Sequence, residues 1–339
     1  MVTGLFIQDT NIYYNPSTIL SYNRLLNFIV GERGYGKTFA FKKWAIDDFL
    51  KRKNQFIWLR RYKTEIKVVK SELFTDIQSF YPDHLFEIKG NVIYIDKNKA
   101  GYILPLSSAQ SYKSTPFPKV NKIIFDEFIV NKSCIHYLHN EVEQFLDFFS
   151  TVARLRDNVR AFFLANAVSV NNPYFDYFNI YPVEDKRFIK NESICIEQAN
   201  GTEYRKEAKK TKFGKLISNS RYGNYAIENK YLLDNDEFVA DKPPQSFYKL
   251  TLCYNNKYYG VYYSYSHKCL YINERKNLNG GNAIAITKDD MKENTMLYKT
   301  SRLKEYIYFI KEMFSQSKII YESIRVKSAF YDIMKVLNM

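Results

Sequence analysis

The stretch LLNFIVGERGYGKTF, residues 25–39, decides which fold this chain adopts. An apolar segment runs into a loop with three glycines, and the loop ends in Gly36, Lys37 and Thr38. From Gly31 onward the letters fit the P-loop pattern G-x-x-x-x-G-K-[ST]. In that pattern backbone N–H groups encircle phosphate oxygens, the lysine reaches the β- and γ-phosphates of ATP, and the threonine hydroxyl binds Mg²⁺. The stretch therefore predicts a strand, a phosphate-binding loop and a helix that begins at about Lys37. The predicted nucleotide-binding residues of the loop are Gly31, Glu32, Arg33, Gly34, Tyr35, Gly36, Lys37 and Thr38.

A second motif follows downstream in NKIIFDEF, residues 121–128, an apolar strand that ends in two acids. A P-loop ATPase needs a carboxylate at a strand end to hold Mg²⁺ and a second group to orient the attacking water. We assign Asp126 to the Mg²⁺ and Glu127 to the water. Two unrelated surface acids are the alternative interpretation.

Hydrolysis by such ATPases often needs a cation from outside the P-loop. The segment TVARLRDNVRAFFLANA, residues 151–167, offers Arg154, Arg156 and Arg160 as candidates for an arginine finger. Surface ion pairs are the expected role for two of the three. Asn166, at the end of the next apolar strand, is a candidate sensor of the γ-phosphate, although asparagine is also common in turns.

The wider pattern predicts the domain organisation. Up to about residue 197, short apolar strands alternate with longer amphipathic segments, which indicates an α/β domain with a mainly parallel sheet covered by helices. Residues 198–230 are basic, with eight Lys/Arg and three Glu from 203 to 230, and predict a small linker domain. Residues 231–339 predict an α+β domain: tyrosine-rich strands, a hairpin turn at Asn255-Asn256, and a helical tail.

Bulk properties suggest a polyanionic partner. Fifty Lys+Arg against 36 Asp+Glu give a net charge of +14, which favours nucleic acid, with a solvated basic surface as the alternative. We find no apolar run near the ~20 residues of a membrane helix. The first residues do not read as a secretory signal. Four scattered cysteines indicate reduced thiols in a cytosolic protein.

Several separate motifs, in the same order and at similar spacing, resemble the DNA-packaging ATPases of φ29-like bacteriophages. They are GERGYGKT, QFIWLRRYK, YPDH, IIFDEF, TVARLR, LANAVSVNNPYF, KRF and TKFGKLI. The resemblance implies an ATPase domain of the ASCE type, a linker domain and a C-terminal domain related to RNase H-like nucleases. It also implies a homopentameric ring that uses ATP and Mg²⁺ to drive double-stranded DNA through the portal of an empty capsid, with a structural RNA as a possible further partner. The expected location is the host cytoplasm, transiently at the portal vertex of the procapsid.

The resemblance also assigns roles to single positions. Arg154 matches the finger that acts on the neighbouring subunit, and Lys113 matches a lysine that reaches the neighbour's nucleotide. Arg33 occupies the P-loop arginine position, and Arg60 resembles a residue near the nucleotide. Lys63 resembles a residue that faces the DNA channel. The loop after IIFDEF carries less positive charge here than in the family pattern, which leaves Lys132 as its expected DNA-contacting cation.

The C-terminal segment does not carry a nuclease signature. The strand FYKLTLCY has Thr251 and Cys253 where a two-metal site would need acids, and Asp289-Asp290 is expected at a helix start. We therefore expect a retained nuclease-like fold without its acid cluster. Residual nuclease activity, a DNA translocase or helicase unconnected to capsids, and a nucleotide-binding scaffold without turnover remain the alternatives. A zinc site at Cys134, His136 and His139 is disfavoured, because a structural site needs four ligands.

Overall fold

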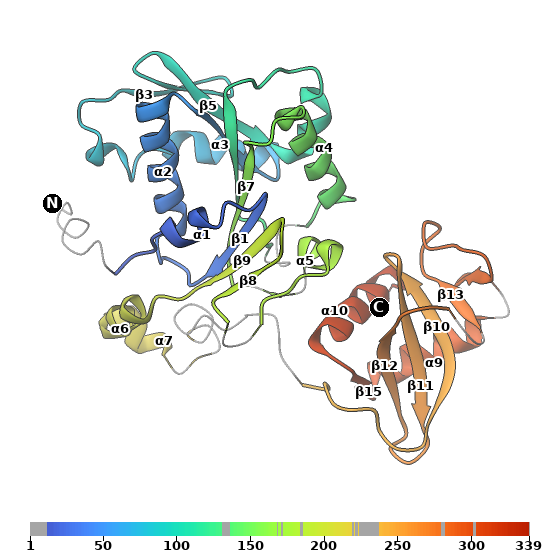
Figure 1. Cartoon of the computed structure of the whole chain (residues 1–339). Helices are drawn as coiled ribbons and strands as arrows, with labels where there is room; N and C mark the ends of the chain where they lie inside the picture. The colour runs from blue at the N-terminus through green and yellow to red at the C-terminus, as the bar shows by residue number, and fades with distance from the viewer. Residues whose placement is uncertain are drawn as a thin grey trace. The chain divides into compact units, whose positions relative to one another are not determined.

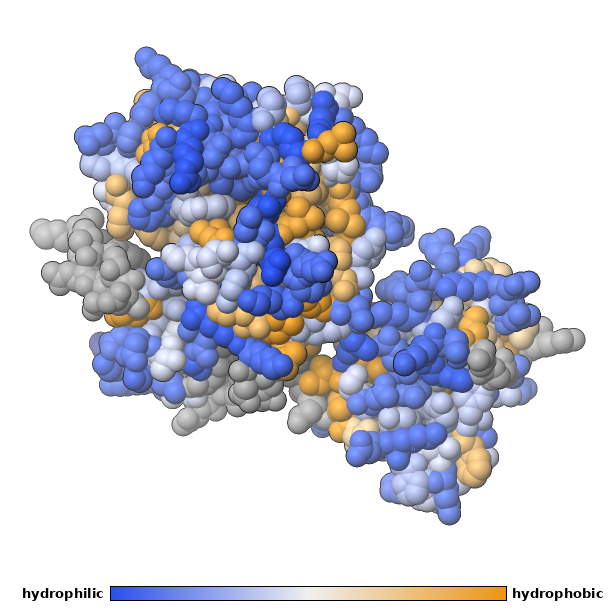
Figure 2. All heavy atoms as spheres, viewed as in Figure 1, coloured by the Kyte–Doolittle hydropathy of each residue, from blue (hydrophilic) through white to orange (hydrophobic). Residues whose placement is uncertain are grey.

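The computed structural model of the chain describes residues 12–130, 136–167, 169–170, 172–183, 186–218, 220, 223, 237–278, 282–300 and 303–338. The chain divides into two compact units, Met1–Leu233 and Asp234–Met339 (Figure 1). Hydrophilic residues dominate the visible face of each unit (Figure 2). Among the described helices, none has the length and apolar character needed to cross a bilayer.

The first unit is built on a nine-stranded sheet with the order β3-β4-β5-β2-β6-β7-β1-β9-β8. Its strands are β1 (Leu26–Gly31), β2 (Gln55–Arg60), β3 (Phe86–Lys89), β4 (Val92–Ile95), β5 (Asn98–Pro105), β6 (Val120–Asp126), β7 (Arg160–Asn166), β8 (Phe188–Lys190) and β9 (Ile194–Ala199). The six strands from β5 to β9 in this order are parallel to one another, and antiparallel strands extend both edges. One strand, β7, separates the P-loop strand β1 from the acidic strand β6.

Helices cover both faces of this sheet, which explains why its central strands are apolar along their whole length. One layer holds α1 (Ser17–Ser21), α2 (Lys37–Arg52) and α3 (Lys63–Glu72), and packs on residues such as Trp58, Phe162 and Leu164. The other holds the 3₁₀ segment η2 (Leu106–Tyr112), α4 (Glu141–Ala153) and α5 (Pro173–Phe178). The predicted α/β architecture with a mainly parallel sheet is confirmed, and so is the helix from Lys37.

The central strand β7 carries an aromatic cluster on the α4 side. Phe163 is fully buried, and its ring centroid lies 4.3 Å from that of Phe28 on β1 and 4.7 Å from that of Phe145 on α4. The ring centroid of Tyr174 on α5 lies 5.1 Å from that of Phe163. These rings join the P-loop strand, the strand beside it and helix α4 into one packed block.

The basic segment begins with two short helices that belong to the first unit. Strand β9 runs two residues past the boundary expected at 197, and α6 (Thr202–Lys210) and α7 (Lys212–Ile217) follow it. Thr211 caps α7 by accepting from the Gly214 amide at 2.9 Å. A separate linker domain over 198–230 stays a prediction, since much of residues 219–236 lies outside the described residues.

The second unit holds a six-stranded sheet with the order β14-β13-β10-β11-β12-β15. Its strands are β10 (Ser246–Tyr254), β11 (Lys257–Ser264), β12 (Cys269–Arg275), β13 (Ala283–Ala285), β14 (Thr295–Leu297) and β15 (Ile319–Tyr321). The helices α9 (Lys304–Ser315) and α10 (Ile324–Val336) pack on one face through residues such as Ile310 and Phe330. The hairpin turn at Asn255-Asn256 is confirmed: both residues have positive φ, 49° and 62°, as a two-residue turn of this kind requires.

The expected helix start at Asp289-Asp290 is wrong. These residues lie in a turn that leads toward β14. Asp290 accepts from both the amide and the hydroxyl of Thr287, at 3.1 and 2.6 Å. The acid therefore closes a local turn, and a short polar side chain that bonds its own neighbouring backbone competes with helix formation.

Removing the ring at the centre of the aromatic block should destabilise the first unit selectively. We expect Phe163→Ala to lower its free energy of unfolding by about 3–5 kcal/mol, the range for large-to-small core changes. Both tryptophans, Trp44 and Trp58, lie in this unit, so tryptophan fluorescence in a urea titration follows it alone. The exposed Val68 on α3 gives a control, Val68→Ala, with a change below about 0.5 kcal/mol. A loss under about 1 kcal/mol for Phe163→Ala would contradict the packing role.

Candidate active site

The P-loop turns from β1 into α2 through two glycines with left-handed backbone. Gly34 has φ +79° and Gly36 has φ +92°, conformations that side chains rarely adopt. Gly36 directly precedes α2, whose first residues are Lys37 and Thr38. The loop amides and the positive end of this 16-residue helix therefore face the same space, a pocket of about 240 Å³. That pocket is lined by Gly34, Gly36, Lys37, Thr38, Phe39, Asp76, Asp126, Glu127, Leu164, Ala165 and Asn166.

Lys37 is a nearly buried cation, with 6% of the residue exposed. Its Nζ donates to the carbonyls of Gly31 and Glu32 at 3.0 and 2.7 Å, and to Asn166 Oδ1 at 3.4 Å. Burial lowers the pKa of this amine to about 8, while Glu32 and Asp126 act in the opposite direction. The ammonium thus lies among neutral oxygens, where an incoming phosphate would be a stronger partner.

Thr38 and Asp126 bring together the ligands that Mg²⁺ prefers. Thr38 Oγ1 lies 3.2 Å from Asp126 Oδ1, at the start of α2 and the end of β6. A hydroxyl and a carboxylate are hard oxygen donors, and Mg²⁺ keeps several waters, so two protein ligands suffice. The residues present therefore fit the ion, which would be held by Thr38 and Asp126 beside the phosphates.

Arg60, the last residue of β2, bridges the two acids of the site. Its Nη1 donates to Asp126 Oδ2 at 3.0 Å and its Nη2 donates to Glu127 Oε2 at 2.7 Å. The Glu127 side chain is 57% exposed, and its backbone has φ +61°, a strained conformation for this residue. The structure thus places Arg60 at the acid pair, beyond the P-loop itself.

The next residue, Arg61, was not predicted from the sequence as a site residue, although it binds the strained backbone at Glu127. Its guanidinium donates to the carbonyls of Glu127 and Phe128, at 3.1 and 2.6 Å, and forms a buried bidentate pair with Glu141 at 2.7 and 2.9 Å. Glu141 also accepts from Tyr174 at 3.0 Å. Because Glu141 begins α4, one buried network connects the backbone of Glu127 with that helix. No local pattern distinguishes Arg61 from its neighbour Arg60.

The three arginines of 151–160 have different surroundings. Arg156 donates to the carbonyls of Phe117, Pro118 and Val152, and Arg160 donates to Asn23 and Asp157, so both join local structure. Arg154 instead ends α4, with φ +43°, and is exposed. Lys113 lies beside the same helix, 3.8 Å from Asp147 Oδ2. Neither Arg154 nor Lys113 lines the pocket of Lys37 within the described part of the chain.

The predicted DNA-contacting residues are only partly described. Lys63 begins α3 and is exposed. The preceding residue, Tyr62, donates its hydroxyl to the carbonyl of His136 at 2.8 Å, which holds His136 beside this end of α3. Lys132 lies outside the described residues, and so does Cys134, so the DNA-contacting cation and the zinc alternative stay untested.

The pocket also contains a carboxylate that the sequence analysis missed. Asp76 lines it from the turn after α3, and Lys42, one turn into α2, pairs with Asp76 Oδ1 at 2.5 Å. Lys42 is nearly buried and donates as well to the Leu73 carbonyl at 3.0 Å. Asp76 lies far from both motifs in sequence, and only the fold brings it to the pocket.

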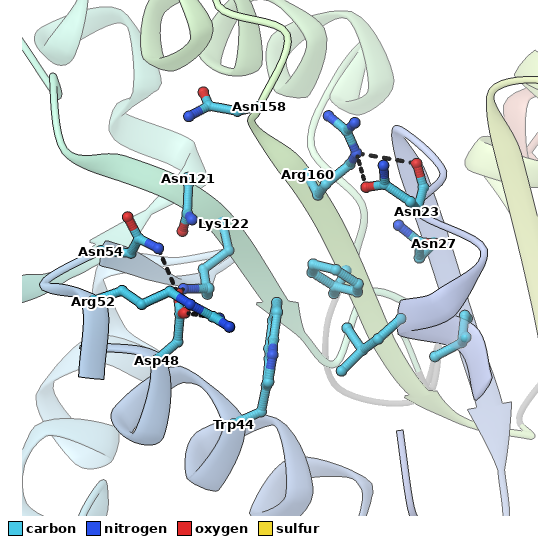
Figure 3. A pocket seen from close by; sticks show the side chains of 13 residues that line it. Asn23, Asn27, Trp44, Asp48, Arg52, Asn54, Asn121, Lys122, Asn158 and Arg160 are labelled. Atoms are coloured by element: carbon cyan, nitrogen blue, oxygen red, sulfur yellow. Dashed lines mark hydrogen bonds and ion pairs between the residues drawn. The ribbon is translucent and has the colours of Figure 1, made fainter. Parts of the chain in front are cut away.

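A second pocket, of about 280 Å³, lies at the opposite edge of the sheet, where β6 and β7 begin (Figure 3). Its charged side chains are already paired: Asp48 accepts from Arg52 at 2.8 Å, from Asn54 at 3.0 Å and from Lys122. The Lys122 ammonium also lies 5.0 Å from the Trp44 ring centroid. This pocket contains neither a glycine-rich loop nor an acid pair, so it is not the nucleotide site.

In the second unit, the centre of β10 is surrounded by cationic and hydroxyl groups. Thr251 is fully buried, and its hydroxyl lies 3.2 Å from Arg275 Nη1 and 2.9 Å from the Tyr248 hydroxyl. A guanidinium at this place would repel divalent metals. Within the described residues, no group of three or more His, Cys, Asp or Glu side chains is arranged to hold a metal ion.

Comparison with known proteins places the chain in a family. Residues 8–339 match the family model described as Podovirus DNA encapsidation protein (Gp16). The chain belongs to this family. It is 36% identical over 330 residues to the DNA packaging protein of Bacillus phage phi29, covering 97% of this chain and 99% of that protein. The DNA packaging protein of Bacillus phage B103 is 36% identical over 320 residues, covering 94% and 99%.

Solved structures agree with the family assignment. The chain resembles one from the bacteriophage Phi-29 viral genome packaging motor assembly with a TM-score of 0.80 and 35% identity, over 96% of this chain and 100% of that one. The N-terminal domain of the DNA packaging ATPase from bacteriophage phi29 matches with a TM-score of 0.53 and 45% identity, over 56% and 97%. The resemblance to φ29-like packaging proteins is thus confirmed, while the relation of the second unit to nucleases stays a prediction.

The buried Lys37 predicts pH-dependent nucleotide binding. A bound phosphate favours the charged amine and raises its pKa, so binding takes up a proton wherever free Lys37 is neutral. Affinity for a non-hydrolysable ATP analogue should therefore fall as pH rises through about 8, approaching about tenfold per pH unit. Titration calorimetry from about pH 7 to pH 9.5 measures this.

Two variants make the pH test specific. Lys37→Met should bind weakly with a flat profile, because the titrating group is gone. Thr38→Ala should weaken binding without changing the slope. A flat profile in the unaltered chain would contradict the proposed role of the Lys37 proton.

Proposed function

We propose that the chain hydrolyses ATP to move double-stranded DNA into a viral capsid, as one subunit of a ring. The observation that carries this proposal is a pocket that brings together the P-loop lysine Lys37, the Thr38–Asp126 pair and Glu127. The exposed Arg154 lies at the end of α4, outside that pocket. A neighbouring subunit would supply its own Arg154 as a further cation, beside the Lys37 and Arg60 of the first subunit.

Within one subunit, Lys37 and the loop amides bind and orient the β- and γ-phosphates. Mg²⁺, held by Thr38 and Asp126, would neutralise charge on the phosphate oxygens. Glu127 accepts a hydrogen bond from the attacking water and directs it in line with the γ-phosphate. Asn166, which accepts from the Lys37 ammonium at 3.4 Å, would act as the sensor of the γ-phosphate.

Between subunits, Arg154 of the next subunit donates to the transferring phosphoryl group, with Lys113 beside it. An arginine finger typically contributes ~10³–10⁵ in rate. Because the site is complete only at an interface, hydrolysis depends on the neighbour's position, and loss of the γ-phosphate loosens that interface. The Phi-29 relative comes from a packaging motor assembly, which supports a multi-subunit arrangement at a portal. Five copies per ring, a packaging RNA and an assembly site in the host cytoplasm are part of the proposal.

DNA would be held through its phosphates. The net charge of +14, the exposed Lys63 and the basic helices α6 and α7 support contacts to a polyanion. A genome must pass whatever its sequence, so contacts should use backbone charge and not base edges.

A mixing experiment tests the shared site. Arg154→Ala and Glu127→Gln chains should each lose nearly all DNA-stimulated ATPase activity. An equal mixture should regain activity, because about one quarter of randomly formed interfaces combine an intact Glu127 with an intact Arg154. Phosphate release as a function of mixing ratio measures the recovery.

The control for the mixing experiment uses two variants that damage the same half of the shared site. Lys37→Ala and Glu127→Gln both damage the nucleotide-holding subunit, so that mixture should stay inactive. Recovery in the control, or none for the Arg154→Ala mixture at any ratio, would contradict a finger that acts across the interface.

Salt dependence tests the DNA contacts. Affinity for duplex DNA should fall steeply with salt and be independent of sequence. Lys63→Ala should reduce the slope of log affinity against log salt by about one unit. Lys51→Ala, an exposed change at the far end of α2, should leave the slope unchanged. Equal slopes for the unaltered chain and Lys63→Ala would remove Lys63 from the interface.

A further inference from the structure

The outer side of the P-loop packs against the start of the basic segment, residues 200–205. Tyr204 donates its hydroxyl to the Arg33 carbonyl at 3.0 Å. A Cβ on Gly34 would lie 2.5 Å from that hydroxyl, and a Cβ on Gly201 would lie 2.5 Å from the Tyr35 ring. The loop expected to bind phosphate on one side therefore has close contacts with the beginning of α6 on the other.

A buried carboxylate is at the centre of this contact. Glu32 is fully buried, and its two oxygens accept from the Gly201 amide at 3.2 and 3.1 Å. Arg205 Nε lies 3.3 Å from Glu32 Oε1. The Arg205 side chain is 21% exposed and also contacts Asn200 Oδ1. The only full positive charge that the structure gives this carboxylate as a direct partner, within the described residues, is therefore that of Arg205.

The position of Glu32 makes its charge matter for nucleotide binding. It belongs to the P-loop itself, and its backbone carbonyl accepts from the Lys37 ammonium at 2.7 Å. An unneutralised carboxylate at Glu32 would repel an approaching polyanion. It would also compete with phosphate for electrostatic attraction to the Lys37 ammonium. In a buried site such like-charge repulsion is only weakly screened.

We propose that Arg205 sets the nucleotide affinity of the P-loop from outside the pocket, by neutralising Glu32. This inference rests on the proposed ATP-binding function and adds a positioning residue from the basic segment. Because coupling between two sites is reciprocal, any displacement of α6 that withdraws Arg205 weakens nucleotide binding, and nucleotide binding in turn favours the docked helix. The basic helices and the P-loop are thereby connected through one ion pair.

A double-mutant cycle on the full chain tests the inference. The probe is the β,γ-imido analogue of ATP with Mg²⁺, and affinity is measured by calorimetry. Arg205→Ala should bind about tenfold more weakly than the unaltered chain, since it leaves the Glu32 charge uncompensated. Glu32→Gln should bind more tightly than the unaltered chain, because a neutral amide no longer opposes the phosphates. The double variant should recover to within about twofold of Glu32→Gln.

The rescue separates charge balance from a structural role. If Arg205 only packed α6 against the loop, Glu32→Gln would not restore binding, and a double variant as weak as Arg205→Ala would overturn the inference. Arg52→Ala is the matched control: it removes a positive charge from a nearly buried carboxylate, Asp48, at the opposite edge of the sheet, and should bind normally. Tryptophan fluorescence confirms that each variant is folded at the assay temperature.

The outcome also separates this inference from the proposed function. Arg205→Ala with unchanged affinity overturns the role of Arg205 while leaving ATP binding intact. An equal loss in Arg52→Ala would likewise overturn it, because the effect would then be general charge loss. Failure of the unaltered chain to bind the analogue would overturn both.

Discussion

The candidate active site of the first unit is organised around a buried positive charge whose hydrogen bonds, among the described residues, go to neutral oxygens. Lys37 donates to two carbonyls and an amide oxygen, and it lies almost completely out of water. Such a group is costly unless an anion comes to it. The loop glycines, the start of α2 and the end of β7 all serve to hold this ammonium where a phosphate can replace neutral oxygens as its partner.

Near that charge, two consecutive arginines at the end of β2 make different contacts. Arg60 faces the carboxylates of Asp126 and Glu127, whereas Arg61 holds the backbone of Glu127 and Phe128 and the first residue of α4. Adjacent residues at a strand end point to opposite sides, so one reaches the pocket and the other reaches the buried helix layer. Glu127 is therefore held at two places, its carboxylate by Arg60 and its strained backbone by Arg61.

The aromatic block on the α4 side supplies rigidity that the proposed site shared between subunits would need. Phe163, Phe28, Phe145 and Tyr174 tie the P-loop strand to the helix that ends in Arg154. Because α4 is anchored at its buried face, its exposed end would stay in a fixed position toward a neighbouring subunit.

In the second unit, the Arg275–Thr251 contact places a cation near the middle of the sheet, where a two-metal nuclease would need acids.

The sequence by itself determined the features that rest on local pattern. The glycine spacing predicted the P-loop and the start of α2, and continuous apolar runs predicted the parallel strands. The pair Asn255-Asn256 predicted the hairpin. Each of these features follows from short-range steric limits or from the local pattern of buried residues. Only the tertiary structure decided that Asp76 enters the pocket, that Arg61 holds Glu127, and that Arg205 pairs with Glu32. Those contacts join residues that are 34 or more positions apart in the sequence. Asp290 shows the same limit, since a side-chain turn replaced the expected helix start. Burial and pairing of charge depend on which surfaces meet, and the linear pattern does not contain that information.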